Sequence, residues 1–221
     1  ILQGRADGII GIFFHDMLET FMPVLERGIP IVRLEGRSYA PIDYPLDTLF
    51  VDNIKASQKA VTHLIHKGHR VIGMLLGDGP PAQDRLAGYR QTLEANGLPF
   101  DPGLTAGHEF SVEEGMRAMR TLLERVPRPT AVYASADVLA IGAIKAAQEA
   151  RLHVPNDLAV VGFDDIFSSW LITPALTTIS LPQRELGREA TQMLFARLTG
   201  ETVGASRSVE VPVDLVVRET T

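Results

Sequence analysis

The chain has 221 residues, 45% of them hydrophobic and 22% charged, with 19 glycines, 14 prolines and no cysteine. This composition is typical of a folded protein of one large or two small α/β units, and it excludes a disordered chain as well as disulfide or thiolate chemistry. The formal charge of -6 excludes a broad basic surface for a nucleic-acid backbone, and no apolar run approaches the roughly 20 residues of a membrane span.

Short runs of β-forming residues alternate with longer stretches of helical period from the start of the chain. Gly97 ends the third helical stretch, as a glycine after a helix commonly does. The alternation predicts parallel strands joined by helices. The elements predicted in this half are, in order, strand 9–14, helix 17–27, strand 30–34, strand 49–51, helix 56–67, strand 71–76 and helix 85–95.

The same alternation continues through the second half of the chain. Ser111 and Glu114 form a capping pattern at the start of a helix, and the continuous apolar run 159–163 is typical of a strand covered by helices on both faces. The elements predicted here are strand 105–110, helix 111–125, strand 130–134, helix 138–150, strand 159–163, strand 177–181, helix 185–199 and strand 209–217.

Ligands of an open parallel sheet bind beyond the carboxyl ends of its strands, so the residues that follow each strand are the candidate site. Carboxylates and arginine can hydrogen-bond two adjacent hydroxyls, and an aromatic ring can cover the apolar face of a sugar or a base. This set therefore predicts a polyol or a nucleobase as ligand. Its members are His15, Asp16, Glu35, Arg37, Asp78, Arg85, Phe110, Ser135, Asp137, Asp164 and Asp165.

Several of these residues also have purely structural interpretations. Asp16 could cap a helix, Asp137 could offset a helix dipole, Phe110 could belong to the core, and Arg85 could be a solvated residue at a helix start. The histidines spaced three apart suggest metal ligands, but positions i, i+3 and i+6 drift around a helix, and the structural interpretation is favoured for them. These histidines are His63, His66 and His69.

Motifs of catalysis are missing from the chain. It contains no G-x-S-x-G, no G-x-x-x-x-G-K-[ST], no H-E-x-x-H and no G-x-G-x-x-G after a strand. The adjacent pair Asp164 and Asp165 could suggest acid/base work, but successive residues at a strand end point in opposite directions. We therefore expect one carboxylate to face the ligand and the other to hold a loop.

The most specific block of the sequence is Val-Pro-Asn-Asp-Leu-Ala-Val-Val-Gly-Phe-Asp-Asp-Ile at 154–166, followed by Pro-Ala-Leu-Thr-Thr-Ile at 174–179. This stretch closely resembles the one by which lactose-repressor and galactose-repressor type transcriptional regulators are identified. The resemblance spans essentially the whole chain. The further matching blocks, in the same order along the chain, are 52–53, 63–70, 85–89 and 213–219.

The resemblance implies an α/β protein with a two-lobed periplasmic-binding-protein-like fold, in which parallel sheets are flanked by helices. Three crossing strands would join the lobes, and the effector would lie in the cleft between them. The expected N-terminal lobe comprises 1–67 with 183–208, and the expected C-terminal lobe comprises 68–182 with 209–221.

The resemblance also implies roles for individual residues. Arg85 would hydrogen-bond effector hydroxyls or a carboxylate, Phe110 would stack on the ligand, and Asp164 would accept from hydroxyls. Asp137 matches the acid of an Asn-Asp pair whose asparagine is replaced here by Ala136, so one polar contact of sugar-binding members is missing. The predicted ligand-binding residues are Arg85, Phe110, Asp164, Asp137, Phe14 and His15, and we predict no metal, cofactor or catalytic residue.

By resemblance, the chain is expected to be the effector-binding and dimerisation part of a cytoplasmic bacterial repressor that senses a sugar or related polyol by cleft closure. Operator DNA would be bound by a homodimer through a helix-turn-helix absent from this chain. Family members also carry two further strands with helices before the position of Ile1, so we expect the first lobe to be incomplete. The alternatives are a solute-binding protein of a sugar transporter and an α/β enzyme with Asp164 as base.

Overall fold

The computed structural model describes residues 6–13, 18–35 and 42–221. The chain forms two compact units, unit 1 (Ile1–Asp52 with Pro182–Pro212) and unit 2 (Asn53–Leu181 with Val213–Thr221). It therefore passes from one unit to the other after Asp52, after Leu181 and after Pro212. In the part of the chain that is described, no helix has the length and hydrophobicity needed to cross a membrane.

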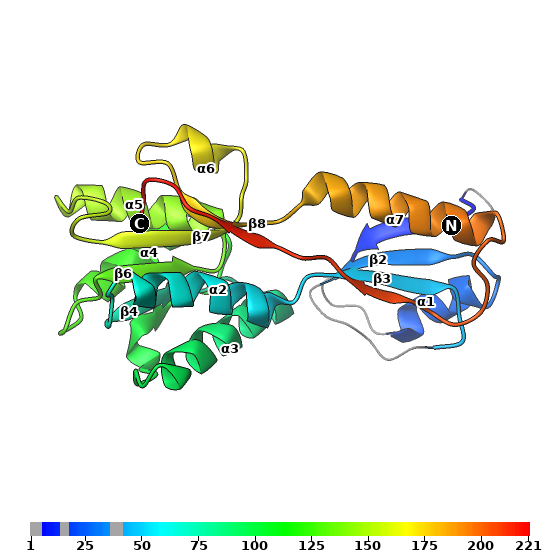
Figure 1. The fold of residues 1–221 in the computed structure, drawn as a ribbon, viewed down its shortest axis with the longest axis horizontal. Coiled ribbons are helices and arrows are strands. Elements are labelled where there is room, and N and C mark those ends of the chain that lie inside the picture. The colour runs from blue at the N-terminus through cyan, green and yellow to red at the C-terminus, as the bar shows by residue number, and fades with distance from the viewer. Residues whose placement is uncertain (1–5, 14–17, 36–41) are drawn as a thin grey trace. The chain divides into compact units, whose positions relative to one another are not determined.

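Unit 1 is a four-stranded parallel sheet in the order β1-β2-β3-β9, with one helix on each face (Figure 1). Adjacent side chains of the central strand β2 point to opposite faces, so Ile31 packs in the cluster with Phe21 of α1, whereas Val32 packs with Met193 of α7. The elements of unit 1 are β1 (Ile9–Ile12), α1 (Leu18–Leu25), β2 (Ile31–Glu35), β3 (Leu46–Phe50), α7 (Gln183–Leu198) and β9 (Ser208–Glu210).

Unit 2 is a six-stranded sheet in the order β10-β8-β7-β6-β4-β5, parallel except for the antiparallel edge strand β10. Its strands are β4 (Ile72–Leu75), β5 (Thr105–Ala106), β6 (Ala131–Ala134), β7 (Ala159–Asp164), β8 (Thr177–Ser180) and β10 (Asp214–Val216). Its helices are α2 (Asn53–His66), α3 (Gly79–Ala95), the 3-10 helix η1 (Pro102–Leu104), α4 (Val112–Leu123), α5 (Asp137–Glu149) and α6 (Ser168–Leu171).

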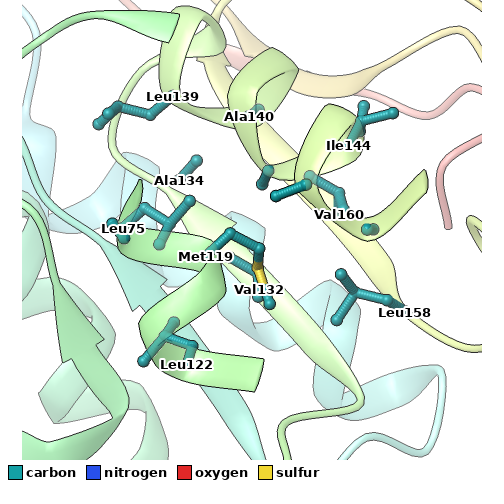
Figure 2. Close-up of a cluster of buried hydrophobic side chains, with 14 of the residues drawn as sticks. Leu75, Met119, Leu122, Val132, Ala134, Leu139, Ala140, Ile144, Leu158 and Val160 are labelled. Carbon is teal, nitrogen blue, oxygen red and sulfur yellow. The ribbon is translucent and has the colours of Figure 1, made fainter. Parts of the chain in front are cut away.

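One hydrophobic core of unit 2 lies between its sheet and the helices α4 and α5 (Figure 2). The two helices approach each other closely because Gly115 and Gly142 carry no side chain. A Cβ on either glycine would overlap with a backbone carbonyl of the other helix. The strand side chains that face this core are Leu75, Val132, Ala134 and Val160, and the helix side chains include Met119, Leu122, Leu139, Ala140 and Ile144.

The opposite face of this sheet is covered by α2 and α3. Tyr133 alternates with its neighbours on β6 and points to this face, where its hydroxyl lies 2.7 Å from the hydroxyl of Ser57 on α2. Tyr89 of α3 donates a hydrogen bond to the carbonyl of Ile72 on β4 at 2.8 Å. Both tyrosines are fully buried, so the sheet is packed on both faces, as its apolar strand β7 predicts.

The domain boundaries differ from the expected ones at three places, one of which is a shift of a single residue that puts Pro182 in unit 1. Helix α2 was expected in the N-terminal lobe, but it packs on α3 and β6 and belongs to unit 2, which begins at Asn53. The single strand predicted over 209–217 is instead two strands, because β9 pairs with β3 in unit 1 whereas β10 pairs with β8 in unit 2. The segment 209–212 therefore belongs to unit 1.

Smaller differences concern single elements. Helix α3 begins at Gly79, six residues earlier than predicted, because Pro80 and Pro81 are tolerated in a first turn whose N-cap is Asp78. The strand predicted over 105–110 shortens to β5, and α6 was not predicted because it is only one turn long. The predicted cap of α4 is present, since Ser111 Oγ accepts from the amide of Glu114 at 3.0 Å.

Candidate functional site

Asp164 ends β7 in a backbone conformation that L-amino acids rarely adopt. Its φ is 113°, and that of Asp165 is 56°. Both values lie in the left-handed region, where a non-glycine residue costs of order 1 to 3 kcal/mol. The surrounding structure therefore has to hold this turn, and the contacts that do so are found on α5 and at the end of the chain.

The two adjacent carboxylates of this turn serve different partners. The Oδ1 atom of Asp164 lies 3.9 Å from Nη1 of Arg85, with the Asp164 side chain 27% exposed. Asp165 instead accepts a 2.6 Å hydrogen bond from Nη2 of Arg218. The two carboxylates have separate partners, as expected for successive residues at a strand end, although the turn that separates them is left-handed rather than extended. That Asp164 faces a ligand stays a prediction.

Arg85 is held on three sides by unit 2. Its Nε donates to Oδ1 of Asn53 at 2.8 Å, and Nη1 donates to the carbonyl of Ser135 at 2.5 Å. The guanidinium carbon lies 3.5 Å from the ring centroid of Phe163, so the cation stacks on an aromatic face. Among the described residues no acceptor takes Nη2, which leaves one donor edge of a well-ordered cation for another partner.

Burial changes the acid–base behaviour of this pair. Desolvation raises the pKa of Asp164 to about 7, although the nearby Arg85 acts in the opposite direction and Asp137 adds to the increase. Burial also lowers the pKa of Arg85, against the stabilising charge of Asp164. The pair therefore offers a hydrogen-bond donor beside a carboxyl group that is acceptor or donor according to its protonation.

Phe110 is connected to this pair through Gly77 and Ser135. Its ring rests on the backbone of Gly77, which follows β4, and a Cβ at Gly77 would overlap with the ring. The amide of Gly77 donates to Oγ of Ser135 at 3.0 Å, and Ser135 is the residue whose carbonyl accepts from Arg85. Phe110 is 43% exposed, so the structure places it at the surface and not in the core.

Both carboxylate oxygens of Asp137 are bonded within unit 2. It is fully buried, its Oδ1 accepts from Thr178 at 2.6 Å, and its Oδ2 accepts from Ser169 at 2.5 Å and from the amide of Ile166 at 2.9 Å. Burial raises the pKa of Asp137 against the lowering effect of these bonds. Asp137 therefore holds the turn that contains Asp164, and its predicted contact with a ligand stays a prediction.

The other predicted residues are those near the start of the chain and the histidines considered as metal ligands. Phe14 and His15 lie outside the described residues, and so does Asp16. The imidazole of His63 bonds to the hydroxyl of Thr221 and that of His69 to the hydroxyl of Thr130, so each serves its own neighbour. Among the described residues no group of three acidic, histidine or cysteine side chains could hold a metal ion.

Sequence reasoning missed two of the groups that shape the site. Asn53 lies in the matching block 52–53 and at the start of a helix, but neither signal indicates that its side chain bonds to Arg85. Phe163 appears in the sequence as an ordinary core residue of a buried strand, and nothing in the pattern indicates that Arg85 stacks on it. Ala136 supplies only a methyl group and makes no side-chain hydrogen bond at the N-terminus of α5.

The chain is similar to characterised proteins along its whole length. The sequence profile of a family described as periplasmic binding protein-like domain matches residues 61–221. The HTH-type transcriptional regulator DegA of Bacillus subtilis is 34% identical over 99% of this chain, and the ribose operon repressor of Escherichia coli is 35% identical over 96%. The chain spans 65% and 64% of these two relatives.

Solved structures of transcriptional regulators also resemble this chain. A complex of the transcriptional regulator CelR with cellobiose superimposes with a TM-score of 0.88 and 32% identity, covering 100% of this chain and 68% of that one. A LacI family transcriptional regulator from Mycobacterium smegmatis superimposes with a TM-score of 0.81 and 30% identity, covering 100% and 80%. The predicted periplasmic-binding-protein-like α/β fold is thereby confirmed.

Proposed function

The chain belongs to the LacI family of transcriptional regulators, and from this membership we propose that unit 2 binds a small-molecule effector through Arg85 and Asp164. The proteins to which it is similar are transcriptional regulators and not enzymes. The effector class that fits best is a sugar or a related polyol, and the whole protein would act as a cytoplasmic repressor.

The observation that carries this proposal is the donor edge of Arg85 beside the carboxyl group of Asp164. Nη1 of Arg85 lies 3.9 Å from Oδ1 of Asp164, so the two side chains are neighbours. A diol could accept from Nη2 of the guanidinium with one hydroxyl and donate to the carboxylate with the next. Phe110 offers an exposed ring to an apolar sugar face. No second basic side chain touches the pair in the described part of the chain, and this argues against a phosphate.

The regulator is favoured over the two alternatives. A solute-binding protein of a transporter would share the fold, but the relatives at 34% and 35% identity are a regulator and a repressor. An enzyme with Asp164 as base is disfavoured for the same reason. We further propose that the effector works by closure of the two lobes, and that operator DNA is bound by a helix-turn-helix outside the two α/β units.

The proposal is tested by thermal denaturation of the chain with a panel of ligands. Mono- and disaccharides, ribose and cellobiose among them, form one arm, and nucleosides form the other. A ligand at 100 times its dissociation constant adds about 2.7 kcal/mol to the free energy of unfolding, which is a clear shift in Tm. A shift with at least one sugar supports the proposal, and shifts confined to nucleosides would overturn the sugar class.

We also propose that the protein is a homodimer, with α6 as part of the contact. Phe167 and Trp170 stack edge to face at 5.0 Å between ring centroids, and with Leu171 they form an apolar cluster exposed by 54 to 69%. Sedimentation equilibrium should give twice the chain mass, and Trp170→Asp should shift the mass toward the monomer. A monomeric wild-type chain would contradict this proposal.

A further inference from the structure

The boundary between the two units lies directly next to a residue of the candidate site. Unit 1 ends at Asp52 and unit 2 begins at Asn53, which is also the first residue of α2. Asn53 is 3% exposed, and its Oδ1 accepts from Nε of Arg85 at 2.8 Å. A hydrogen bond from a buried cation is among the stronger polar contacts in a protein, so this bond ties the side chain of Asn53 to that of Arg85.

The geometry of Arg85 depends on this bond. The stacking on Phe163 fixes the plane of the guanidinium, and the bond to the carbonyl of Ser135 fixes one corner. The bond from Nε to Asn53 fixes the rotation within that plane and so the direction of Nη2. Without Asn53, the donor edge proposed to meet the effector would lose its orientation.

A second boundary is linked to the other half of the site in the same way. Leu181 is the last residue of unit 2 before the chain returns to unit 1, and its amide donates to the carbonyl of Asp164 at 3.4 Å. The third boundary differs, since the carbonyl of Val213 accepts from Nζ of Lys59 at 2.5 Å. At two of the three boundaries between the units, a boundary residue is therefore hydrogen-bonded to Arg85 or Asp164. At the third boundary, Val213 is bonded to Lys59 of α2 instead.

We infer that Asn53 is a positioning residue for the effector site, and that its bond to Arg85 transmits the state of that site to the first passage between the units. The inference rests on the proposed function for its meaning, because Arg85 is taken as the effector donor. A ligand that shifts the guanidinium of Arg85 would also shift Asn53, because one hydrogen bond joins them. Asn53 is the first residue of unit 2 after the boundary at Asp52. This gives effector occupancy a direct route to the chain segment that joins the units.

The link can be measured on the ligand-free chain by NMR of ¹⁵N-labelled protein. The Nε–H signal of Arg85 is identified by its loss in Arg85→Lys, and its solvent exchange is then followed in the Asn53 variants. Asn53→Ala and the milder Asn53→Ser, whose side chain is too short to reach Nε, should accelerate exchange by about tenfold or more. Asn53→Asp keeps an acceptor oxygen and should preserve the wild-type rate.

A matched control comes from the same pair of helices. Gln58 of α2 donates to Gln91 of α3 at 3.1 Å on the exposed surface, so Gln58→Ala also removes a side-chain bond between α2 and α3. It should leave the exchange of the Arg85 Nε–H unchanged. If Asn53→Ala and Asn53→Ser both leave that rate at the wild-type value, the positioning role is overturned.

The transmission is tested by amide hydrogen exchange of the passages in Arg85→Lys. The segment 50–54 should exchange faster than in wild type, whereas the segment 212–216 at the third boundary should not change. Unchanged exchange at 50–54 would overturn the inference, and so would equal acceleration at both segments. Failure of the proposed function would appear separately, as the lack of any stabilising sugar.

Discussion

Asp164 shows how a single residue can work against the stability of its own fold. Its pKa rises from 3.8 to about 7 in the folded protein. Between these values the folded chain holds a proton that the unfolded chain has released. The stability contributed by this group is therefore full below the unfolded value and is lost as the pH rises to about 7.

This linkage predicts the behaviour of Asp164→Asn. The amide stays neutral, so the variant should gain stability over wild type as the pH is raised from about 5 to about 8. Urea denaturation at the two pH values, with Arg85 and Asp137 unchanged as the nearest charges, measures the difference. A gain of the same size at both pH values would contradict the raised pKa.

Asp137 is predicted to be essential for the turn that contains Asp164. Asp137→Ala leaves the buried donors of Ile166, Ser169 and Thr178 without their acceptor, and we expect a loss of about 2 to 3 kcal/mol in the free energy of unfolding. Asp157→Ala, which removes an exposed carboxylate bonded to His153, is the control. Equal losses of unfolding free energy in the two variants would contradict the role of Asp137 in holding this turn.

At this scale the sequence predicts some site residues better than others. Arg85, Phe110 and Asp164 became candidates through their places after strands of a parallel sheet and through the roles that the family resemblance implies. The sequence left the role of Asp137 open because a carboxylate at a helix start has the same pattern whether it meets a ligand or a buried hydroxyl. Asn53 and Phe163 were missed because their contacts come from segments distant in the sequence.

Among the elements, β3 is held by a buried carboxylate between two arginines. Asp47 is fully buried and accepts from Arg197 at 2.7 Å and from Arg207 at 2.6 Å. Burial raises its pKa, but the hydrogen bonds from the two guanidinium groups outweigh this effect and bring the pKa below its ordinary value. This contribution to stability is present above the unfolded pKa and is lost as the pH falls through the folded one.

Asp47→Ala should therefore destabilise unit 1 by about 3 to 5 kcal/mol, because it leaves two cations without their shared partner. Hydrogen exchange that accelerates in α7 and β3 while α5 keeps its protection is the expected signature. Lys59→Ala, which removes an exposed ion pair with Asp214, should change neither. Protection retained in α7 would show that the Asp47 cluster does not hold unit 1.

Two helix glycines should respond in opposite directions to the same substitution. Gly142→Ala places a Cβ against the carbonyl of Val112 and should cost about 1 to 3 kcal/mol by separating α4 from α5. At Gly187 of α7 no atom lies within 4 Å of the added Cβ, and Gly187→Ala should stabilise by about 0.4 to 1 kcal/mol. Shifts of the same sign in Tm would contradict the packing described for α4 and α5.

The elements themselves were largely predictable from hydrophobic period and from caps such as Ser111. The exception that mattered most was the end of the chain, where one alternating run over 209–217 was divided between two sheets. Alternation of apolar and polar residues predicts that a segment is a strand, but it does not predict which sheet the strand joins. The position of α2 was mistaken for the same reason, because an apolar helix face does not indicate which unit the helix packs against.

For the whole molecule, the family membership and the contacts within unit 2 support one account of the function. Arg85 and Asp164 would receive the effector, Asp137 would hold the strained turn, and Asn53 would connect the site to the boundary between the units. The affinity for the effector would then depend mainly on the side chains of Arg85 and Asp164.

The most direct test is calorimetric titration of wild type, Arg85→Lys and Asp164→Asn with the sugar that gives the largest shift in the thermal panel. Each substitution removes one partner of a buried polar contact and should weaken binding by about 1 to 3 kcal/mol, or about 5- to 150-fold in Kd. Folded variants that both bind this sugar with wild-type affinity would show that the effector is held elsewhere.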